Sequence, residues 1–307
     1  MSAAPALVIA GFLAAAVRVA TPLLLAATGE LIAERSGIIN LGIEGGMLGG
    51  ALAAAIGSAA FGPWVGLAAG VAAGVALALI FALVAIGAGA DQIIAGTAMT
   101  LGAVGLTGGV YHQVFGAAGA GLTIPTLGVL RPPGLASLPL VGEALFAEPA
   151  TTYLALLAVP VTGWWLYHTR AGLALRAAGE GAAAARAVGV RVRTVRAGAT
   201  LVAGAFAGAA GASLVLAQVG TFTERMTAGR GFVAIAIVVL GRWRPGGVLL
   251  ASLLFGAAMA LQYVFQAAGL AVPYQLFLML PYVLTLGALA GAGRRVRAPA
   301  DLGRALD

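Results

Sequence analysis

The sequence predicts an all-α polytopic membrane protein with about nine (eight to ten) transmembrane helices, because of its composition, its hydropathy and the length of its apolar segments. Of 307 residues, 61% are hydrophobic and 9% are charged, and the mean hydropathy is +1.04. A soluble domain carries about 25% charged residues. A chain so poor in charge cannot cover a surface that faces water, so we expect one membrane domain over residues 1–307, solvated mainly by lipid.

Nine apolar segments are the candidate crossings, since a bilayer core about 30 Å thick needs about 20 residues of helix. Two of them, 37–60 and 91–115, are long enough but carry polar side chains. The run 231–241 is short, and it reaches a crossing only if it begins near Met226. The remaining six segments are 6–28, 62–90, 151–169, 197–219, 246–268 and 271–292.

Arginine clusters orient the chain, because cytoplasmic loops of membrane proteins carry an excess of basic residues. The loop 170–196 holds six arginines against Glu180, and the tail 293–307 holds four. Both are expected in the cytoplasm, which requires an even number of crossings between them and makes 226–241 a tilted crossing. The N-terminus is then outside the plasma (inner) membrane, the segment 29–36 inside, and the Gly- and Pro-rich loop 116–150 outside.

Several function classes are excluded by what the sequence lacks. There is no lysine, so no Walker A phosphate-binding loop can form, and there is no cysteine for thiolate chemistry. Neither His112 nor His168 has a partner at metal-ligand spacing, so no metal site is expected. No soluble basic face is present for nucleic acid. We therefore expect a chain that is not an enzyme and binds no cofactor itself.

Glu44 is the strongest candidate for a functional side chain. An ionisable group at the centre of a membrane helix costs about 2.5–3.5 kcal/mol on insertion scales. Asn40 lies one helical turn before it, which predicts one shared face. Glycines in SGIINLGIEGG predict a broken helix whose freed backbone groups line a cavity. The alternative is an interfacial carboxylate paired with Arg35, and the residues alone favour neither role.

Further polar side chains lie in the other apolar segments. Gln92, Thr100 and Gln218 are candidates for hydrogen bonds to a polar solute, with ties between helices as the alternative. Arg18 either pairs with a buried carboxylate or extends toward the headgroups. Glycines recur at every fourth position from 42 to 50 and from 62 to 74, and this favours close helix packing over a glycine-lined pore.

The stretch 179–189 predicts a short exposed helix within the cytoplasmic loop. Its alanines favour helix, Glu180 suits a positive helix N-terminus, and Gly189 suits a left-handed stop. A short helix held between two membrane helices is suited to transmit force to a partner, with an ordinary amphipathic loop as the alternative. The residues of this expected coupling surface are Gly179, Glu180, Ala183, Ala184, Arg186 and Gly189.

Three blocks resemble the permeases of ribose- and nucleoside-type ABC importers, the branch grouped with branched-chain amino acid permeases. They are TPLLLAATGELIAERSGIINLGIEGGMLGGALAA (21–54), RAAGEGAAAARAVGVRVRTVRAGATLVAGAFAGAAGA (176–212) and GRGFVAIAIVVLGRWRPGGVLLASLLFG (229–256). Their order and spacing also match, so the resemblance covers most of residues 20–292. The motifs ERSGIINLGIEG and GRGF…LGRW are most similar to the shorter permease of nucleoside importers.

The resemblance implies two inverted halves with a central pathway at a dimer interface. It implies a permease subunit that passes a nucleoside or simple sugar while a separate ATPase subunit binds and hydrolyses ATP. The stretch 179–189 would then sit in a groove of that ATPase. Further implied partners are a second permease, which is either a homologue or another copy of this chain, an extracytoplasmic solute-binding lipoprotein, and membrane lipid.

Two positions depart from the pattern of that family. Ala183 stands where an acid is expected, which puts in doubt a specific ion pair at the ATPase contact, and Arg244 stands where Asn is frequent. The alternative function is an ATP-independent secondary transporter or channel. It would need membrane carboxylates for a coupling ion, and the candidates are Glu44 and Asp91.

Overall fold

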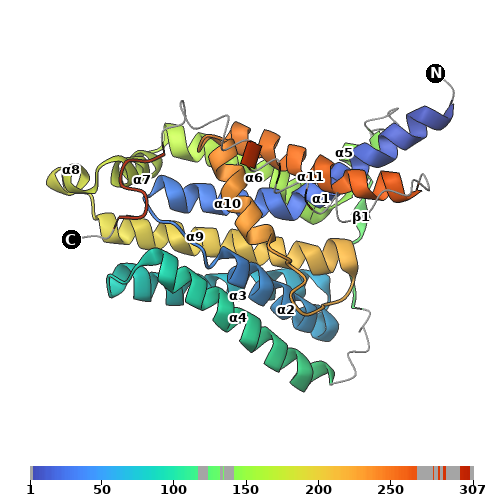
Figure 1. Ribbon diagram of the computed structural model, residues 1–307, viewed down its shortest axis with the longest axis horizontal. Coiled ribbons are helices and arrows are strands. Elements are labelled where there is room, and N and C mark those ends of the chain that lie inside the picture. Colours follow the sequence, from blue (N-terminus) through green and yellow to red (C-terminus); the bar gives the residue numbers. More distant parts are fainter. Residues whose placement is uncertain are drawn as a thin grey trace.

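The computed structural model describes residues 3–116, 124–131, 134, 142–267, 279, 283, 286–287 and 298–304. Long helices lie along one axis of the molecule, with α1 (Ala3–Arg35), α9 (Val192–Ser213) and α11 (Pro245–Ala267) roughly side by side (Figure 1). On the other side of α9 lie α2 (Ile43–Phe61), α3 (Pro63–Phe81) and α4 (Gln92–Phe115). Helices α3 and α9 continue as π-helical turns, η1 (Ala82–Gly87) and η2 (Leu214–Val219).

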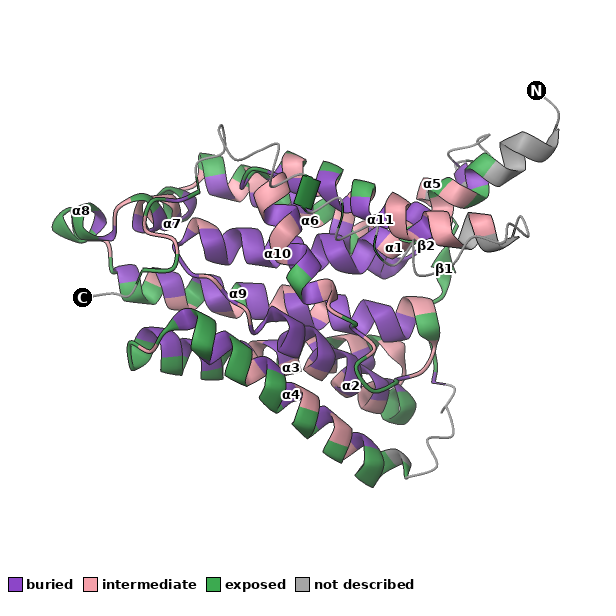
Figure 2. Ribbon diagram, in the orientation of Figure 1, coloured by how far each residue is buried: buried purple, intermediate pink, exposed green. Residues whose placement is uncertain are grey.

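Shorter elements complete the bundle. Helix α6 (Ala150–His168) leads into α7 (Arg170–Glu180) and α8 (Ala182–Ala187) at one end of the molecule, with α10 (Arg230–Leu240) crossing the bundle obliquely (Figure 1). At the opposite end, β1 (Val129–Leu130) pairs antiparallel with β2 (Glu148–Pro149), next to α5 (Gly142–Phe146). Burial is greatest along α1, α2 and α9, while α4 and α8 are largely exposed (Figure 2).

Among the described residues, six helices are long and apolar enough to cross a membrane. They match six of the nine expected crossings. Helix α6 matches a seventh, 151–169, with 19 residues but lower hydropathy, and the expected crossing 271–292 falls almost entirely outside the described residues. The six are Ile9–Arg35, Ile43–Phe61, Pro63–Gly87, Gln92–Val114, Val192–Val219 and Pro245–Gln262.

The first helix is longer than the sequence predicts. Of the segment 29–36, expected as a cytoplasmic loop, residues 29–35 instead form the last turns of α1, where Glu30 is 0% and Glu34 is 2% exposed. Both carboxylates find donors inside the protein: Glu30 accepts the Asn40 N–H at 3.0 Å, and Glu34 accepts the indole N–H of Trp243. Because these bonds replace water, the helix continues to Arg35.

The expected crossing 37–60 is broken near its start, as its glycines predict. Residues 36–42 are not helical, Gly37 has φ +96°, and α2 begins at Ile43. Asn40 therefore lies before the helix, so the prediction that Asn40 and Glu44 share one helical face is wrong. The Asn40 side chain accepts the Gly42 N–H at 3.0 Å instead, which is a local bond that competes with helix.

The expected crossing 226–241 contains an 11-residue helix that begins only at Arg230. An α-helix of 11 residues rises about 16 Å, which is half of a bilayer core. Its end lies beside the end of α1, because Arg35 Nε donates to the Trp243 carbonyl at 2.9 Å. The chain enters this segment from Gly220, which follows η2 at the C-terminal end of α9. A non-helical stretch and a short helix together connect the two ends.

The regularly spaced glycines pack helices together, as predicted. Helices α2, α3 and α9 meet along these positions. A Cβ added at Gly50 would lie 2.6 Å from Gly208 Cα, and one added at Gly70 would lie 2.8 Å from the Gly50 carbonyl oxygen. Any larger residue there would force the backbones apart.

The stretch 179–189 is not one helix. Helix α7 ends at Glu180, and α8 begins at Ala182, whose N–H donates to the Asp301 carboxylate at 2.6 Å. Glu180 therefore stands at a helix C-terminus, not at the expected N-terminus. Gly189, with φ +88°, follows the end of α8 as a stop, which the sequence does predict.

Candidate functional site

Glu44 occupies the N-terminus of α10. Its carboxylate accepts hydrogen bonds from Thr227 Oγ1 at 2.6 Å, from the Gly229 N–H at 2.8 Å and from the Gly231 N–H at 2.6 Å. A helix begins with unsatisfied N–H groups and a partial positive charge, so a carboxylate there is stabilised. The side chain is 6% exposed, and these short bonds take the place of its water.

The close contact between Glu44 and the start of α10 depends on a glycine at position 231. A Cβ added at Gly231 would lie 2.6 Å from Glu44 Cα and 2.8 Å from Glu44 Oε2. Only a residue without a side chain lets α10 begin against α2. The motif GRGF and the motif GIEG, far apart in the sequence, therefore form one contact in the interior of the bundle.

Three predicted residues surround the break before α2. Asn40 is 3% exposed, and its N–H donates to Glu30. Gln92 Oε1 accepts the Ile39 N–H at 2.9 Å, and Thr100 Oγ1 donates to the Leu41 carbonyl at 3.0 Å. Backbone that is not helical survives at membrane depth only where such partners satisfy it. Asn40, Gln92 and Thr100 thus come together with Glu44 around residues 38–44.

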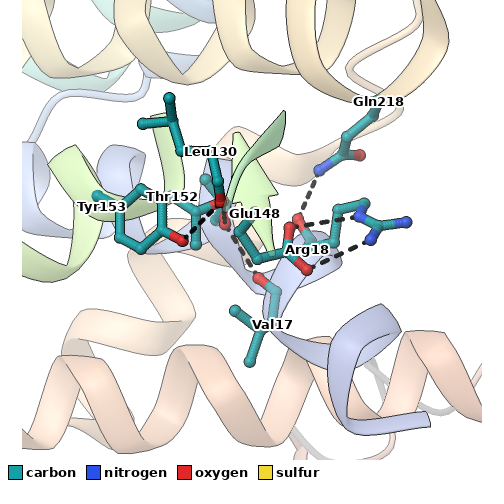
Figure 3. A network of polar contacts seen from close by, with 8 residues as sticks. Val17, Arg18, Leu130, Glu148, Thr152, Tyr153 and Gln218 are labelled. Carbon is teal, nitrogen blue, oxygen red and sulfur yellow. Dashed lines mark hydrogen bonds and ion pairs between the residues drawn. The ribbon is translucent and has the colours of Figure 1, made fainter. Parts of the chain in front are cut away.

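Gln218 lies apart from this group, at the opposite end of α9. Its Nε2 donates to the Arg18 carbonyl at 2.6 Å, and Figure 3 shows both residues beside Glu148. The Arg18 guanidinium pairs with the Glu148 carboxylate at 3.3 Å. Two roles were predicted for Arg18, and the structure confirms the ion pair with a buried carboxylate.

Glu148 was not a sequence candidate, because the long loop 116–150 indicates exposed polar residues. In the folded chain the Glu148 side chain is instead 0% exposed, and it pairs with Arg18, whose side chain is about half exposed. Burial raises the pKa of Glu148, and the bond and charge of Arg18 oppose that rise. Nearby, the Thr21 and Thr152 hydroxyls are 3.1 Å apart and tie α1 to α6.

The other end of the bundle carries the expected coupling surface. Ala183, Ala184 and Arg186 are exposed on α8, as is Gly189 beyond it, whereas Gly179 is buried. Glu180 pairs with Arg35 at 3.6 Å. Arg35 therefore faces the coupling end, and the alternative pairing of Arg35 with Glu44 is wrong.

A groove of about 840 Å³ opens between α6 and the start of α11. None of the five predicted pathway residues lines it. Its walls are mostly apolar, with Arg35, Arg244 and Tyr167 as the polar members. The candidate pathway residues lie instead in packed contacts of this single chain.

Buried groups at the coupling end were missed by the sequence analysis. Glu30, Glu34 and Arg196 are each at most 2% exposed, and each makes a hydrogen bond to another residue of the chain. One signal was present: the two acids stand four residues apart and continue the helical period of the apolar segment before them. Their partners come from distant parts of the chain, which no local pattern indicates.

A family model described as the permease component of branched-chain amino acid transport systems matches residues 12–289. The chain belongs to this permease family. This permease is a multi-pass membrane protein and a transport subunit, and permeases of ABC transporters act with an ATPase and a solute-binding protein.

Curated relatives of the permease are also ABC transporter permeases. A Haloferax volcanii protein assigned as a glucose ABC transporter permease is 45% identical over 268 residues, covering 85% of this chain and 80% of that protein. The guanosine ABC transporter permease protein of Bacillus subtilis is 33% identical, with 91% of each chain covered. The nucleoside ABC transporter permease protein of Lactococcus lactis subsp. cremoris is 32% identical, with 88% of each covered. No solved structure matches the permease.

Proposed function

We propose that this permease forms the translocation pathway of an ABC importer for a nucleoside or a simple sugar. The observation that carries the proposal is similarity over nearly the whole chain to permeases named for glucose, guanosine and nucleoside transport. In this proposal ATP is bound by a partner ATPase, and this chain binds no cofactor. A second permease, either a homologue or another copy of this chain, completes the pathway, and an extracytoplasmic lipoprotein delivers the solute.

The ATPase contact is proposed at α8. This helix protrudes at one end of the bundle, and its outer surface is alanine with few charges (Figure 1). Ala183 and Ala184 are exposed, and Val188 beyond the helix is 80% exposed. An apolar, small-residue surface next to polar loops is suited to a fitted protein contact. Shape rather than charge therefore dominates the proposed interaction.

The proposed moving part of the pathway is the broken segment around Glu44. Discontinuous membrane helices commonly form the substrate sites of transporters at mid-membrane depth. Asn40, Gln92 and Thr100 hold this segment, and Glu44 links it to the start of α10. When the subunits rearrange, release of these bonds would present the same polar groups to solute. Gln218 would act nearer the outer end, beside Arg18.

The orientation proposed from arginine clusters has partial support. The Asp301 N–H of the tail donates to the Gly179 carbonyl at 2.9 Å, so the tail and the coupling loop lie at one end of the molecule. Helix α1 begins at the other end (Figure 1). We propose that the shared end is cytoplasmic and the start of α1 is outside.

The competing function, an ion-coupled secondary transporter, requires membrane carboxylates that are available to an ion. Asp91 instead caps α4 by accepting the Ile93 and Ile94 N–H groups, both at 2.9 Å. Glu44 accepts three donors of its own chain. Both candidates are thus bonded within this chain, and the similarity to permeases of ABC transporters favours the ATP-driven mechanism.

The test is uptake by proteoliposomes that contain this permease, its partner permease and ATPase, with the cognate binding protein supplied outside. We expect labelled nucleoside or glucose to accumulate only with ATP and with an ATPase that can hydrolyse it. A catalytically inactive ATPase is the matched control. Transport by the purified permease without any ATPase would contradict the proposal, and so would an absence of uptake of both solute classes by the complete, hydrolysing complex.

A further inference from the structure

Arg196, near the start of α9, is buried and makes hydrogen bonds to three other segments of the chain. It is 1% exposed, and within the described part of the chain its guanidinium donates to four backbone carbonyl oxygens. Its Nε donates to Ser36 at 3.0 Å, its Nη1 to Arg304 at 2.9 Å, and its Nη2 to Ala178 at 3.4 Å and Asp301 at 3.5 Å. One guanidinium therefore holds the end of α1, the end of α7 and the C-terminal tail.

The tail makes its own bonds to the same segments. The Asp301 N–H donates to the Gly179 carbonyl at 2.9 Å, and the Asp301 carboxylate accepts the Ala182 N–H at 2.6 Å. The Gly303 N–H donates to the Gly37 carbonyl at 3.0 Å. Residues 298–304, which we call the tail strap, thus lie between the start of α8 and the break that precedes α2.

The tail strap also reaches the residues that support the break. The Arg304 carbonyl accepts both Arg196 Nη1 and Gln92 Nε2, the latter at 3.4 Å. Gln92 Oε1 in turn accepts the Ile39 N–H. A continuous path of hydrogen bonds therefore runs from α8 through Asp301 and Arg304 to Ile39, five residues before Glu44.

We propose that Arg196 and Asp301 are positioning residues that join α8 to the broken segment 36–42 through the tail strap. The inference rests on the proposed function, because α8 is the proposed ATPase contact. If Arg196 lost these carbonyl acceptors, its charged N–H groups would be buried without hydrogen bonds, which is costly. Displacement of α8 therefore moves Ser36 and Gly37 with it. The strap converts motion at the ATPase contact into motion of the segment that carries Asn40 and Glu44.

The decisive variants change the carboxylate that accepts the α8 N–H. Asp301→Ala removes this acceptor, while Asp301→Asn keeps an oxygen at the same position. Ala300→Ser is the matched control, since Ala300 is an exposed residue of the same strap. In the reconstituted complex, we expect Asp301→Ala to lower the number of solute molecules imported per ATP hydrolysed by about fivefold, the effect of losing one hydrogen bond. Asp301→Asn restores most of this ratio, and Ala300→Ser keeps it.

Two results of that experiment overturn the inference. One is an unchanged coupling ratio in Asp301→Ala with normal ATPase activity and import. The other is a parallel loss of ATPase activity and import at an unchanged ratio, which a purely structural role predicts. Import by the wild-type permease without an ATPase would instead refute the proposed function, so the two failures are distinguishable.

A second measurement needs no transport. Hydrogen exchange of the full-length permease in detergent reports the opening of backbone N–H groups segment by segment. We expect Asp301→Ala to speed exchange in residues 182–187 and also in residues 36–42, with Ala300→Ser unchanged. Faster exchange in residues 182–187 alone would overturn the connection to the broken segment.

Discussion

The Gly231 N–H donates to the Glu44 carboxylate at 2.6 Å, and this bond joins the first turns of two helices that lead away from each other. Helix α2 runs from this point toward the end of the bundle where Ser58 bonds the Pro125 carbonyl. Helix α10 runs toward the opposite end, where Trp243 bonds Glu34. Helices of opposite direction whose N-termini meet inside the bundle are typical of inverted repeats in transporters, and an inverted repeat is the architecture that the family resemblance implies.

Removing the Glu44 carboxylate should affect both stability and transport. Glu44→Ala leaves three buried donors without their acceptor, and each such loss costs about 1–3 kcal/mol. We expect a lower melting temperature in detergent and lower uptake per permease molecule in membranes, with Glu44→Gln intermediate because one amide oxygen remains. A lowered melting temperature with normal uptake per molecule would show that Glu44 ties the helices and has no part in the pathway.

The sequence predicts the elements of this fold better than their ends. Six of the long apolar segments form helices that are long and apolar enough to cross a membrane, because lipid-facing helices need apolar side chains all round. The loop 29–36 is wrong because a hydropathy pattern treats Glu30 and Glu34 as solvated. Their donors lie at Asn40 and Trp243, and the second is more than 200 residues away. Only the folded chain brings such partners together.

The break before α2 was predictable from the sequence, but the geometry around it was not. Glycines around Asn40 indicate a break, and the break is present. The sequence places Asn40 and Glu44 on one helix because it shows no reason for α2 to begin as late as Ile43. That reason is a set of bonds from Gln92, Thr100 and the tail to the backbone of residues 37–41. Hydrogen bonds between distant segments leave no periodic signal.

Glycine contacts between α3 and α9 should be sensitive to a single methyl group. A Cβ at Gly208 would meet the Gly70 carbonyl and lie 3.1 Å from Gly74 Cα, whereas a Cβ at Gly102 would have nothing within 4 Å. Overpacking costs about 1–3 kcal/mol, so we expect Gly208→Ala to lower the melting temperature in detergent. Gly102→Ala is the control and should leave it unchanged or raise it. Equal effects of the two substitutions would contradict the close packing.

Glu148 should make the permease less stable as pH rises. Its carboxyl pKa is raised in the folded chain by burial, against the attraction of Arg18. The folded state therefore holds this proton more tightly than the unfolded state. Stability from this group is complete below the ordinary carboxyl pKa of 4.5 and falls as pH rises through the raised value. We expect Glu148→Gln to flatten the decline of the melting temperature above pH 4.5, and an unchanged pH profile would refute this.

Orientation is directly testable because the chain contains no cysteine. Val188, beyond α8, is 80% exposed, and Val129, in the loop at the opposite end, is 48% exposed. We expect a membrane-impermeant thiol reagent to label Val129→Cys on intact cells and to label Val188→Cys only after permeabilisation. The reverse pattern would place the arginine-rich end outside and remove α8 from the ATPase side.

The contact of α8 with an ATPase should depend on shape more than on charge. Ala184 is exposed on α8, and a tryptophan there would hold a fitted partner surface away. Glu180 is half exposed and already paired with Arg35, and an exposed ion pair contributes about 0–1 kcal/mol. We therefore expect Ala184→Trp to uncouple ATP hydrolysis from uptake in the reconstituted complex, and Glu180→Gln to have a smaller effect. Ala171→Trp, an exposed alanine on α7, controls for the bulk of the new side chain. Normal coupling in Ala184→Trp, or equal damage from Ala171→Trp, would move the ATPase contact away from α8.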